Sequence, residues 1–332
     1  MPSAELERLC KPAHRQCVTR RRLGGSIVAA IELEGLTKRF GNVVAVDGLD
    51  LTVREGEIFG FLGPNGAGKS TTIDILLDFI RPTDGTATVL GHDAQSEGLA
   101  VRNRIGVLPD AYHVYDRLTG RQHVEFAIEM KGIDGDPDAL LERVRVADAA
   151  DRKAGGYSKG MRQRLILAMA LVGDPELLIL DEPSTGLDPN GAREMREIIR
   201  AENDRGATVF FSSHIMEQVE AVCDRVAIID RGQLVAVDTI DGLRDATEVG
   251  ETLYVYVSTL DEDVLERVRT LEGIGTAAID DGRLRVTVDG VSKFAVLHAI
   301  DEITAVQDFS VVESSLEDLF VRYTNDRQEI NS

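Results

Sequence analysis

One glycine-rich stretch contains the first set of candidate functional residues. It fits the pattern G-x-x-x-x-G-K-S/T at every fixed position, between an apolar run at residues 57–62 and a helix-forming run at residues 71–77. Glycines let successive backbone N–H groups point at one anion, and a helix start adds a partial positive charge. The pattern predicts a phosphate-binding loop whose lysine reaches the β- and γ-phosphates and whose serine hydroxyl ligates Mg²⁺. The loop residues are Gly63, Pro64, Asn65, Gly66, Ala67, Gly68, Lys69, Ser70 and Thr71.

A second set of candidate residues follows two apolar runs further along the chain. Asp181 and Glu182 come after residues 177–180, and His214 comes after residues 208–213. Runs of this length and composition predict buried strands. A carboxylate at the C-terminal end of such a strand is where a phosphate-loop enzyme needs one, because it faces the Mg²⁺ of the nucleotide. We therefore expect the acidic pair to lie beside the loop.

The periodicity of the apolar residues predicts the helices and strands that carry these candidates. A helical pattern covers residues 118–149 with a break at 134–137, which predicts an inserted helical subdomain at about 112–172. A further helix is predicted from residue 157, and residues 184–189 predict a turn. The predicted strands are residues 31–36, 43–53 with a turn at 47–48, 86–90 after a turn at 81–85, 105–110, 177–182, 208–213, 226–230 and 233–237.

The region after residue 244 has an element order of its own. Alternating and helical patterns give strand, helix, strand, strand, helix and strand, which is the ferredoxin-like order of a small α+β domain. Ser314 and Glu317 form a capping box for a last helix through Tyr323. The six elements are predicted at residues 252–258, 261–271, 275–280, 283–288, 291–300 and 305–311.

The chain is long for a single core and strongly acidic. Its 332 residues predict two domains, and 37 basic against 57 acidic side chains give a net charge of −20. Residues 245–332 carry 7 basic and 19 acidic groups, a net −12. Such a surface repels nucleic acid phosphates and argues against DNA or RNA binding. Only seven of the cations are lysine, which fits a high-salt cytoplasm and an ordinary acidic cytosolic protein equally well.

The remaining composition places the chain in a reducing compartment. No apolar run approaches the roughly 18 residues of a membrane helix, so we expect any membrane association to go through a partner. Cys10, Cys17 and Cys223 form neither a C-x-x-C pair nor an even disulfide framework. Residues 1–30 lack periodicity, and three arginines at 20–22 superficially resemble a twin-arginine export signal. Because the following apolar stretch is weak, we expect a disordered extension or a start codon assigned too early.

These motifs together resemble the nucleotide-binding subunit of an ATP-binding cassette (ABC) transporter over residues 31–244. The similarity is greatest to exporters of drugs, antibiotics, lipids or polysaccharides, whose ATPase subunits often carry a small C-terminal domain, and residues 313–320 resemble that branch too. The resemblance implies an α/β phosphate-loop NTPase domain of ABC type at residues 31–244, with an antiparallel strand subdomain and a helical insert. A small accessory domain at residues 245–332 and an N-terminal extension at residues 1–30 complete the predicted organisation.

The resemblance assigns roles to five residues outside the loop. Phe40 matches the aromatic residue that stacks on adenine. Asp181 matches the residue that holds Mg²⁺, and Glu182 matches the general base that deprotonates the attacking water. Asp188 matches the turn that signals between protomers. His214 matches the residue that contacts the γ-phosphate and the catalytic water.

Two motifs depart from the family pattern. The signature is usually Leu-Ser-Gly-Gly-Gln, and residues 157–161 are Tyr-Ser-Lys-Gly-Met, in which Ser158 and Gly160 are kept and Lys159 adds a cation. The serine hydroxyl and the helix start are what bind a γ-phosphate, so binding should persist. Asp110 stands where the family usually has a glutamine that senses the Mg²⁺–water shell. A carboxylate can accept from water or approach Mg²⁺, but it cannot donate as an amide does.

The implied function is ATP hydrolysis that powers a separate membrane permease for export. ATP and Mg²⁺ would bind in a head-to-tail homodimer, with each ATP between the loop of one chain and the signature of the other. The subunit would lie in the cytoplasm, on the cytoplasmic face of the cell membrane. The alternative is a soluble ABC-type ATPase of translation or cofactor assembly, although such translation factors usually carry two cassettes and this chain has one loop. A regulator with little turnover is a third reading, which Glu182 argues against.

Overall fold

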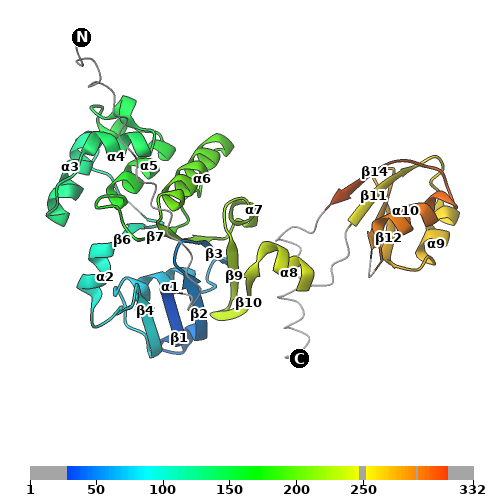
Figure 1. Ribbon diagram of the computed structural model, residues 1–332, viewed down its shortest axis with the longest axis horizontal. Helices are drawn as coiled ribbons and strands as arrows, with labels where there is room; N and C mark the ends of the chain where they lie inside the picture. Colours follow the sequence, from blue (N-terminus) through cyan, green and yellow to red (C-terminus); the bar gives the residue numbers. More distant parts are fainter. Residues whose placement is uncertain (1–27, 112, 247–251, 289–290, 313–332) are drawn as a thin grey trace, which may run out of the picture.

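The computed structural model describes residues 28–111, 113–246, 252–288 and 291–312. They form three sheets, each with its own element order (Figure 1). We call residues 28–246 the N-terminal domain and residues 252–312 the C-terminal domain. Most of the predicted N-terminal extension and the capping box at Ser314 lie outside the described residues.

The central sheet of the N-terminal domain has six strands in the order β10-β9-β3-β8-β7-β6. Pairing is parallel from β9 to β6, and β10 is antiparallel to β9. Every residue of β3, β7 and β8 is buried, as expected for strands covered on both faces. The strands are β3 (Ile58–Leu62), β6 (Ile105–Leu108), β7 (Leu177–Asp181), β8 (Thr208–Ser213), β9 (Arg225–Asp230) and β10 (Gln233–Thr239).

Alternate residues of these strands enter two different hydrophobic clusters. In β3, Ile58 faces one cluster and Phe59 the other, and in β7 the same holds for Leu178 and Ile179. The first cluster includes the helical insert, and the second includes the antiparallel sheet. The parallel strands are therefore fixed from both sides, and their C-terminal ends meet at one edge of the sheet.

An antiparallel sheet of four strands in the order β2-β1-β4-β5 forms the predicted strand subdomain. The boundaries of three strands differ from prediction, and the first of these, β1, extends beyond the predicted 31–36 at both ends. The predicted turn at residues 47–48 is an irregularity inside one long strand, where Gly48 has a φ of +61°, and β4 begins within the predicted turn at 81–85. The strands are β1 (Ala29–Phe40), β2 (Val43–Arg54), β4 (Asp84–Val89) and β5 (His92–Asp93).

The helical insert is confirmed, with its break where it was predicted. Helix α3 ends before Gly132, whose φ is +64°, and α4 begins at Pro137 with Asp136 as N-cap. Figure 1 shows α3, α4 and α5 gathered at one end of the domain. The helical elements here are α3 (Gly120–Lys131), α4 (Pro137–Arg143), two 3₁₀ turns (Ala147–Ala149 and Ala154–Gly156) and α5 (Lys159–Ala170).

The turn predicted at residues 184–189 leads into a long helix for which the sequence analysis had no element. An Asp-Pro pair is typical of turns and equally of a helix start, because proline suits the first helical position. Here Asp188 is the N-cap and Pro189 the first residue of α6. The remaining helices of the N-terminal domain are α1 (Lys69–Leu76), α2 (Gly98–Arg104), α6 (Pro189–Asp204), α7 (Met216–Glu220) and α8 (Ile240–Ala246).

The C-terminal domain confirms the ferredoxin-like element order. Its sheet has the strand order β12-β13-β11-β14 with every pairing antiparallel. A separate hydrophobic cluster fills it, and no buried member of that cluster comes from the described part of the N-terminal domain. The elements are β11 (Thr252–Val257), α9 (Glu262–Arg269), β12 (Ile274–Asp280), β13 (Arg283–Val288), α10 (Lys293–Asp301) and β14 (Val306–Val312).

Candidate nucleotide-binding site

The glycine-rich loop connects β3 to α1, and its shape requires glycine at two positions. A Cβ added at Gly63 would collide with the backbone oxygen of Ile229. Gly68, the N-cap of α1, has a φ of +108° and lies so close to Ala45 that an added Cβ would be 2.5 Å from its backbone oxygen. The loop is therefore packed tightly against neighbouring backbone, and its N-terminal end is tied to β8 by the Gly63 N–H, which donates to the Ser213 oxygen at 3.3 Å.

Lys69, the first residue of α1, is 6% exposed. Its Nζ donates to the Gly63 oxygen at 2.7 Å and lies 3.5 Å from Glu182 Oε1. A buried ammonium is costly unless it is paired and hydrogen-bonded, and here both conditions are met. The loop lysine and the predicted base therefore lie together, although 113 residues of sequence separate them.

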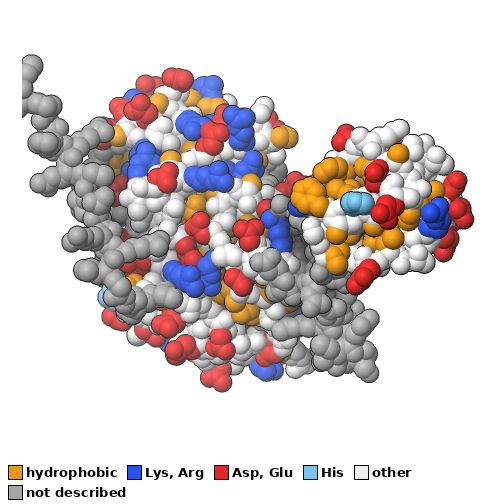
Figure 2. Space-filling model, turned by 45° about the vertical axis from the view of Figure 1, so that its right-hand side comes forward, with side chains coloured by type: hydrophobic (Ala, Val, Ile, Leu, Met, Phe, Trp, Pro, Cys, Tyr) orange, Lys and Arg blue, Asp and Glu red, His pale blue; other side chains and the backbone are white. Residues whose placement is uncertain are grey.

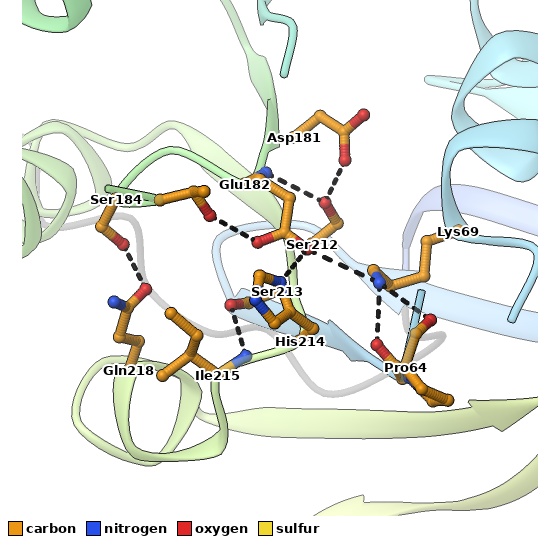
Figure 3. Close-up of polar contacts among 12 residues, drawn as sticks. Pro64, Lys69, Asp181, Glu182, Ser184, Ser212, Ser213, His214, Ile215 and Gln218 are labelled. Atoms are coloured by element: carbon orange, nitrogen blue, oxygen red, sulfur yellow. Dashed lines mark hydrogen bonds and ion pairs between the residues drawn. The ribbon is translucent and has the colours of Figure 1, made fainter. Parts of the chain in front are cut away.

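Asp181 ends β7, and its carboxylate is buried beside the end of β8. The Ser212 hydroxyl donates a hydrogen bond to Asp181 Oδ1 (Figure 3). Burial raises the pKa of Asp181, the Ser212 hydrogen bond opposes that rise, and the nearby Asp110 and Glu182 carboxylates add to it. A cation placed at this carboxylate would offset the burial, as expected at a metal-binding position.

Glu182 is positioned by contacts on both its backbone and its side chain. Its φ of +51° is in the left-handed region, which is rare for a residue other than glycine. The Glu182 N–H donates to the backbone oxygen of Ser212 at 3.2 Å, and Thr185 Oγ1 donates to Glu182 Oε2 at 2.8 Å. His214 Nδ1 lies 2.8 Å from Oε1, and because a carboxylate only accepts, Nδ1 is the donor (Figure 3).

A cavity of about 170 Å³ opens over the loop, between it and the strand ends. It combines backbone N–H groups, an ammonium, a hydroxyl and carboxylates, the donor set that a phosphate chain and Mg²⁺ need. In the parts of the chain that the structure describes, no three His, Cys, Asp or Glu side chains could hold a metal unaided. Mg²⁺ usually takes one or two carboxylates from a protein and completes its shell with phosphate oxygens and water. The cavity is lined by Ala45, Asn65, Gly66, Gly68, Lys69, Ser70, Thr71, Asp110 and Glu182.

The signature residues lie elsewhere in the same chain. Ser158 is the N-cap of α5, where its Oγ accepts from the Met161 N–H at 3.3 Å. Lys159 lines a second cavity of about 630 Å³, and neither it nor Ser158 or Gly160 is among the described residues around the loop cavity. Asp110 lines both cavities. The second cavity is bounded by Asp110, Ala111, His113, Val114, Asp116, Tyr157, Lys159 and Arg162.

Asp188 and Phe40, like Asp181 and His214, do not line the loop cavity. Asp188 caps α6 and accepts from the Gly191 N–H at 2.7 Å. Phe40 ends β1 with 49% of its surface exposed, and the Nζ of Lys38 lies 4.9 Å from its ring centroid. An aromatic ring exposed at a strand end is available for stacking on a base.

Three residues of the site were missed by sequence reasoning. Ser212 and Thr185 bond the acidic pair, and Ala45 lines the cavity from β2. Ser212 had a signal, because the apolar run of β8 changes there to two serines directly before His214. Thr185 and Ala45 had none, because their proximity depends on how the loop and sheets fold back.

Comparison with known proteins decides the family. The chain is 36% identical over 315 residues to a daunorubicin resistance ATP-binding protein of Streptomyces coeruleorubidus, covering 90% of this chain and 96% of the relative. A sequence model of the ABC transporter family matches residues 46–185. The chain belongs to the ATP-binding subunits of the ABC transporter family. Other relatives of this ABC subunit include a fluoroquinolones export ATP-binding protein of Mycobacterium tuberculosis, 37% identical over 89% of this chain and 93% of the relative.

Solved structures show the same fold for the N-terminal domain. An ATP-binding subunit of an ABC transporter is 27% identical, with a TM-score of 0.60 over 66% of this chain and 93% of that one. A dimeric ATP-binding cassette bound to ADP and Pi has a TM-score of 0.58 at 22% identity, over 63% of this chain and 98% of that one. The predicted α/β phosphate-loop fold of ABC type is thereby confirmed.

Membership of the family carries the activity with it. The chain is an ATP-hydrolysing subunit that binds ATP and works with a membrane permease, as predicted, and the alternative role in translation or cofactor assembly is not favoured. Among the helices of the described ranges, none is long and apolar enough to cross a membrane.

Proposed function

We propose that ATP binds over residues 63–71 and is hydrolysed with Glu182 as the general base. Lys69 and the backbone N–H groups of the loop would hold the β- and γ-phosphates, and Phe40 would stack on the adenine. Ser70, Asp181 and, through water, Asp110 would hold Mg²⁺, which when bound neutralises charge on the phosphate oxygens. The contact set around Glu182 is the observation that carries the proposal, because it fixes a buried carboxylate beside the loop lysine.

Glu182 would take a proton from the attacking water through its carboxylate. Lys69 and His214 both approach Oε1, and Thr185 donates to Oε2, so the carboxylate has one orientation. A base held in this way needs little reorganisation when the water arrives. His214 is 36% exposed in its side chain, so from its place beside Oε1 it could also contact a γ-phosphate that enters from solvent.

The complete site would be shared between two chains stacked head to tail. Within one chain the signature residues Ser158, Lys159 and Gly160 do not line the loop cavity, so a second copy would have to supply them. The start of α5, with Ser158 as its N-cap, offers N–H groups to a γ-phosphate. Asp188 starts α6 close after the Glu182 loop, where it could report on the partner's nucleotide. The dimeric cassette among the related folds supports this arrangement.

The permease partner would be an exporter, because related subunits are named for daunorubicin resistance and fluoroquinolones export. We place its docking site near residues 110–121, beside Asp110 and the helical insert. The subunit would then lie on the cytoplasmic face of the membrane. Figure 2 shows acidic side chains on both domains, mixed with basic ones on the N-terminal domain, and the net charge of −20 argues against a nucleic acid partner.

Glu182→Gln tests the base directly, because it keeps the shape of the side chain and removes its basicity. Hydrolysis should fall by on the order of 10²–10⁴-fold while ATP binding survives. A closed ATP-bound dimer should accumulate, which size-exclusion chromatography with and without ATP would detect. Normal turnover in this variant would falsify the base assignment.

A further inference from the structure

Ser212 is a hydroxyl buried at the centre of the site. It is the fifth residue of β8, between β3 and β7 in the sheet, and it is completely buried. In the strand register it lies directly beside Asp181. The two residues before it, Phe210 and Phe211, are fully buried aromatics. A hydroxyl in such surroundings is costly unless its hydrogen-bonding capacity is used.

Both capacities of the Ser212 hydroxyl are used, each by one residue of the acidic pair. The Glu182 N–H is shared between Ser212 Oγ and the Ser212 backbone oxygen, each at 3.2 Å, and Ser212 Oγ donates to Asp181 Oδ1. Because an N–H can only donate, the hydroxyl proton must point at Asp181. One oxygen atom therefore connects the side chain of Asp181 to the backbone of Glu182 (Figure 3).

We propose that Ser212 is a positioning residue that sets the metal-binding carboxylate and the general base in one geometry. By donating to Oδ1, its hydroxyl holds the Asp181 carboxylate in one orientation. This fixes the direction in which the second carboxylate oxygen, Oδ2, points. The acceptor side of the hydroxyl adds a second anchor, beside the Ser212 backbone oxygen, for the Glu182 N–H, and the Glu182 φ of +51° is a conformation that needs such support. The inference rests on the proposed function, because it assigns Ser212 to the roles given there to Asp181 and Glu182.

A purely structural role for this hydroxyl makes a different prediction, and the chain offers a matched control. Ser213 is the next residue of β8 and equally buried, and its Oγ accepts from the Ile215 N–H at 3.0 Å. Within the described residues, neither this bond nor the one that the Ser213 backbone oxygen accepts from the Gly63 N–H involves the acidic pair. If burial of a hydroxyl is all that matters, Ser212→Ala and Ser213→Ala should behave alike.

The first measurement is the gain in affinity that Mg²⁺ gives to a fluorescent, non-hydrolysable ATP analogue over the affinity in EDTA. A hydrogen bond to a charged group contributes enough free energy that its loss in Ser212→Ala should reduce this gain in affinity roughly tenfold. Ser213→Ala should keep the wild-type gain. In EDTA the wild type, Ser212→Ala and Ser213→Ala should bind the analogue equally. Equal binding would also show that the loop is folded in both variants.

The second measurement is steady-state hydrolysis by the full chain. Ser212→Ala should lower kcat by roughly ten- to a hundredfold, and KM for ATP in Mg²⁺ should rise by no more than the roughly tenfold loss seen in the first measurement. Ser212→Thr keeps the hydroxyl on a side chain that suits strands, and it should restore both the Mg²⁺ gain and kcat. The alanine pair decides the proposal by itself if the threonine variant does not fold.

Three results would overturn the proposal. The first is an equal Mg²⁺ gain in Ser212→Ala and Ser213→Ala. The second is a folded Ser212→Thr that restores neither the Mg²⁺ gain nor kcat. The third is a wild-type protein whose affinity for the analogue does not change with Mg²⁺. The proposed function is judged separately, by wild-type hydrolysis and its loss in Glu182→Gln. A protein that passes that test and fails the Ser212 test retains the function and loses only this assignment.

Discussion

The two domains differ in what they bury. Within the described residues, twelve of the thirteen buried polar or charged side chains lie in the N-terminal domain, and Thr304 is the single one in the C-terminal domain. Four of the twelve, Lys69, Asp181, Glu182 and Ser212, meet at the strand ends around the loop. The C-terminal core is instead aliphatic, with Leu, Val, Ile and Ala from its sheet and two helices.

This difference indicates that the reactive groups belong to the N-terminal domain, whereas the C-terminal core serves packing. Burying charges is tolerated where they are paired, and it is expected where a reaction needs them. An aliphatic core gives stability but no reactive groups. Apolar side chains also gather on the C-terminal domain's surface in Figure 2, with Phe294 69% exposed. We therefore assign ATP chemistry to the N-terminal domain alone and propose that the C-terminal domain folds as a unit with a regulatory or coupling role.

The largest expected effect is the loss of C-terminal domain stability in Leu284→Ala. Leu284 is fully buried in β13, and truncating such a residue costs about 2–5 kcal/mol of unfolding free energy. Hydrogen exchange followed by mass spectrometry should show faster exchange in β11 and β13, with β7 and β8 unchanged. ATP affinity should stay at the wild-type value. Faster exchange in β7 would show that the two cores unfold together.

A somewhat smaller effect, on ATP affinity, is expected from Phe40→Ala in the N-terminal domain. Stacking of an aromatic side chain on a base is worth roughly 1–3 kcal/mol, so ATP affinity should fall by about tenfold to a hundredfold. Titration with a fluorescent ATP analogue measures it. Phe294→Ala, which removes an exposed phenylalanine from the other domain, is the control and should bind normally. Unchanged affinity in Phe40→Ala would make this ring a structural residue.

The smallest effect on nucleotide binding should come from deleting residues 245–332. All the loop, acidic and signature residues precede this region, and its hydrophobic cluster is separate. The truncated protein should bind ATP within about twofold of the full chain, as expected for a domain with its own core. Changes in turnover or permease coupling are expected instead. Loss of ATP binding would place the boundary elsewhere and join the two regions in one folding unit.

Local patterns were sufficient to predict most elements of the fold. Apolar runs that end in polar residues predicted β7 and β8, and the break at residues 134–137 matched the end of α3 and the start of α4. Helix α6 was missed because Asp188-Pro189 suits both a turn and a helix start, and only the amphipathic residues beyond it separate the two. Local sequence thus specifies elements well and their junctions less well.

The candidate site could be predicted as a set of residues but not as an arrangement. The loop and the acidic pair have strong sequence patterns, and the structure places them together. The contact of Glu182 with His214 and the bridge through Ser212 depend on β7 and β8 being neighbours in the sheet. Strand order comes from long-range packing, so no local pattern contains it.

The central claim is that two chains share each ATP site, and mixing two inactive variants tests it most directly. Lys69→Ala removes the loop cation and Ser158→Arg blocks the signature, so each homodimer has a lesion in both of its sites. In a mixed dimer one site has both groups intact and the other has both lesions.

With random exchange and independent sites, about a quarter of wild-type ATPase activity should return, from the symmetry count alone. ATP-dependent dimer formation is measured in the same mixture, because obligate cooperation between sites would suppress activity but not assembly. Recovered activity near a quarter supports the shared site. Neither activity nor dimers, with both variants folded and the wild-type protein dimerising, would contradict it.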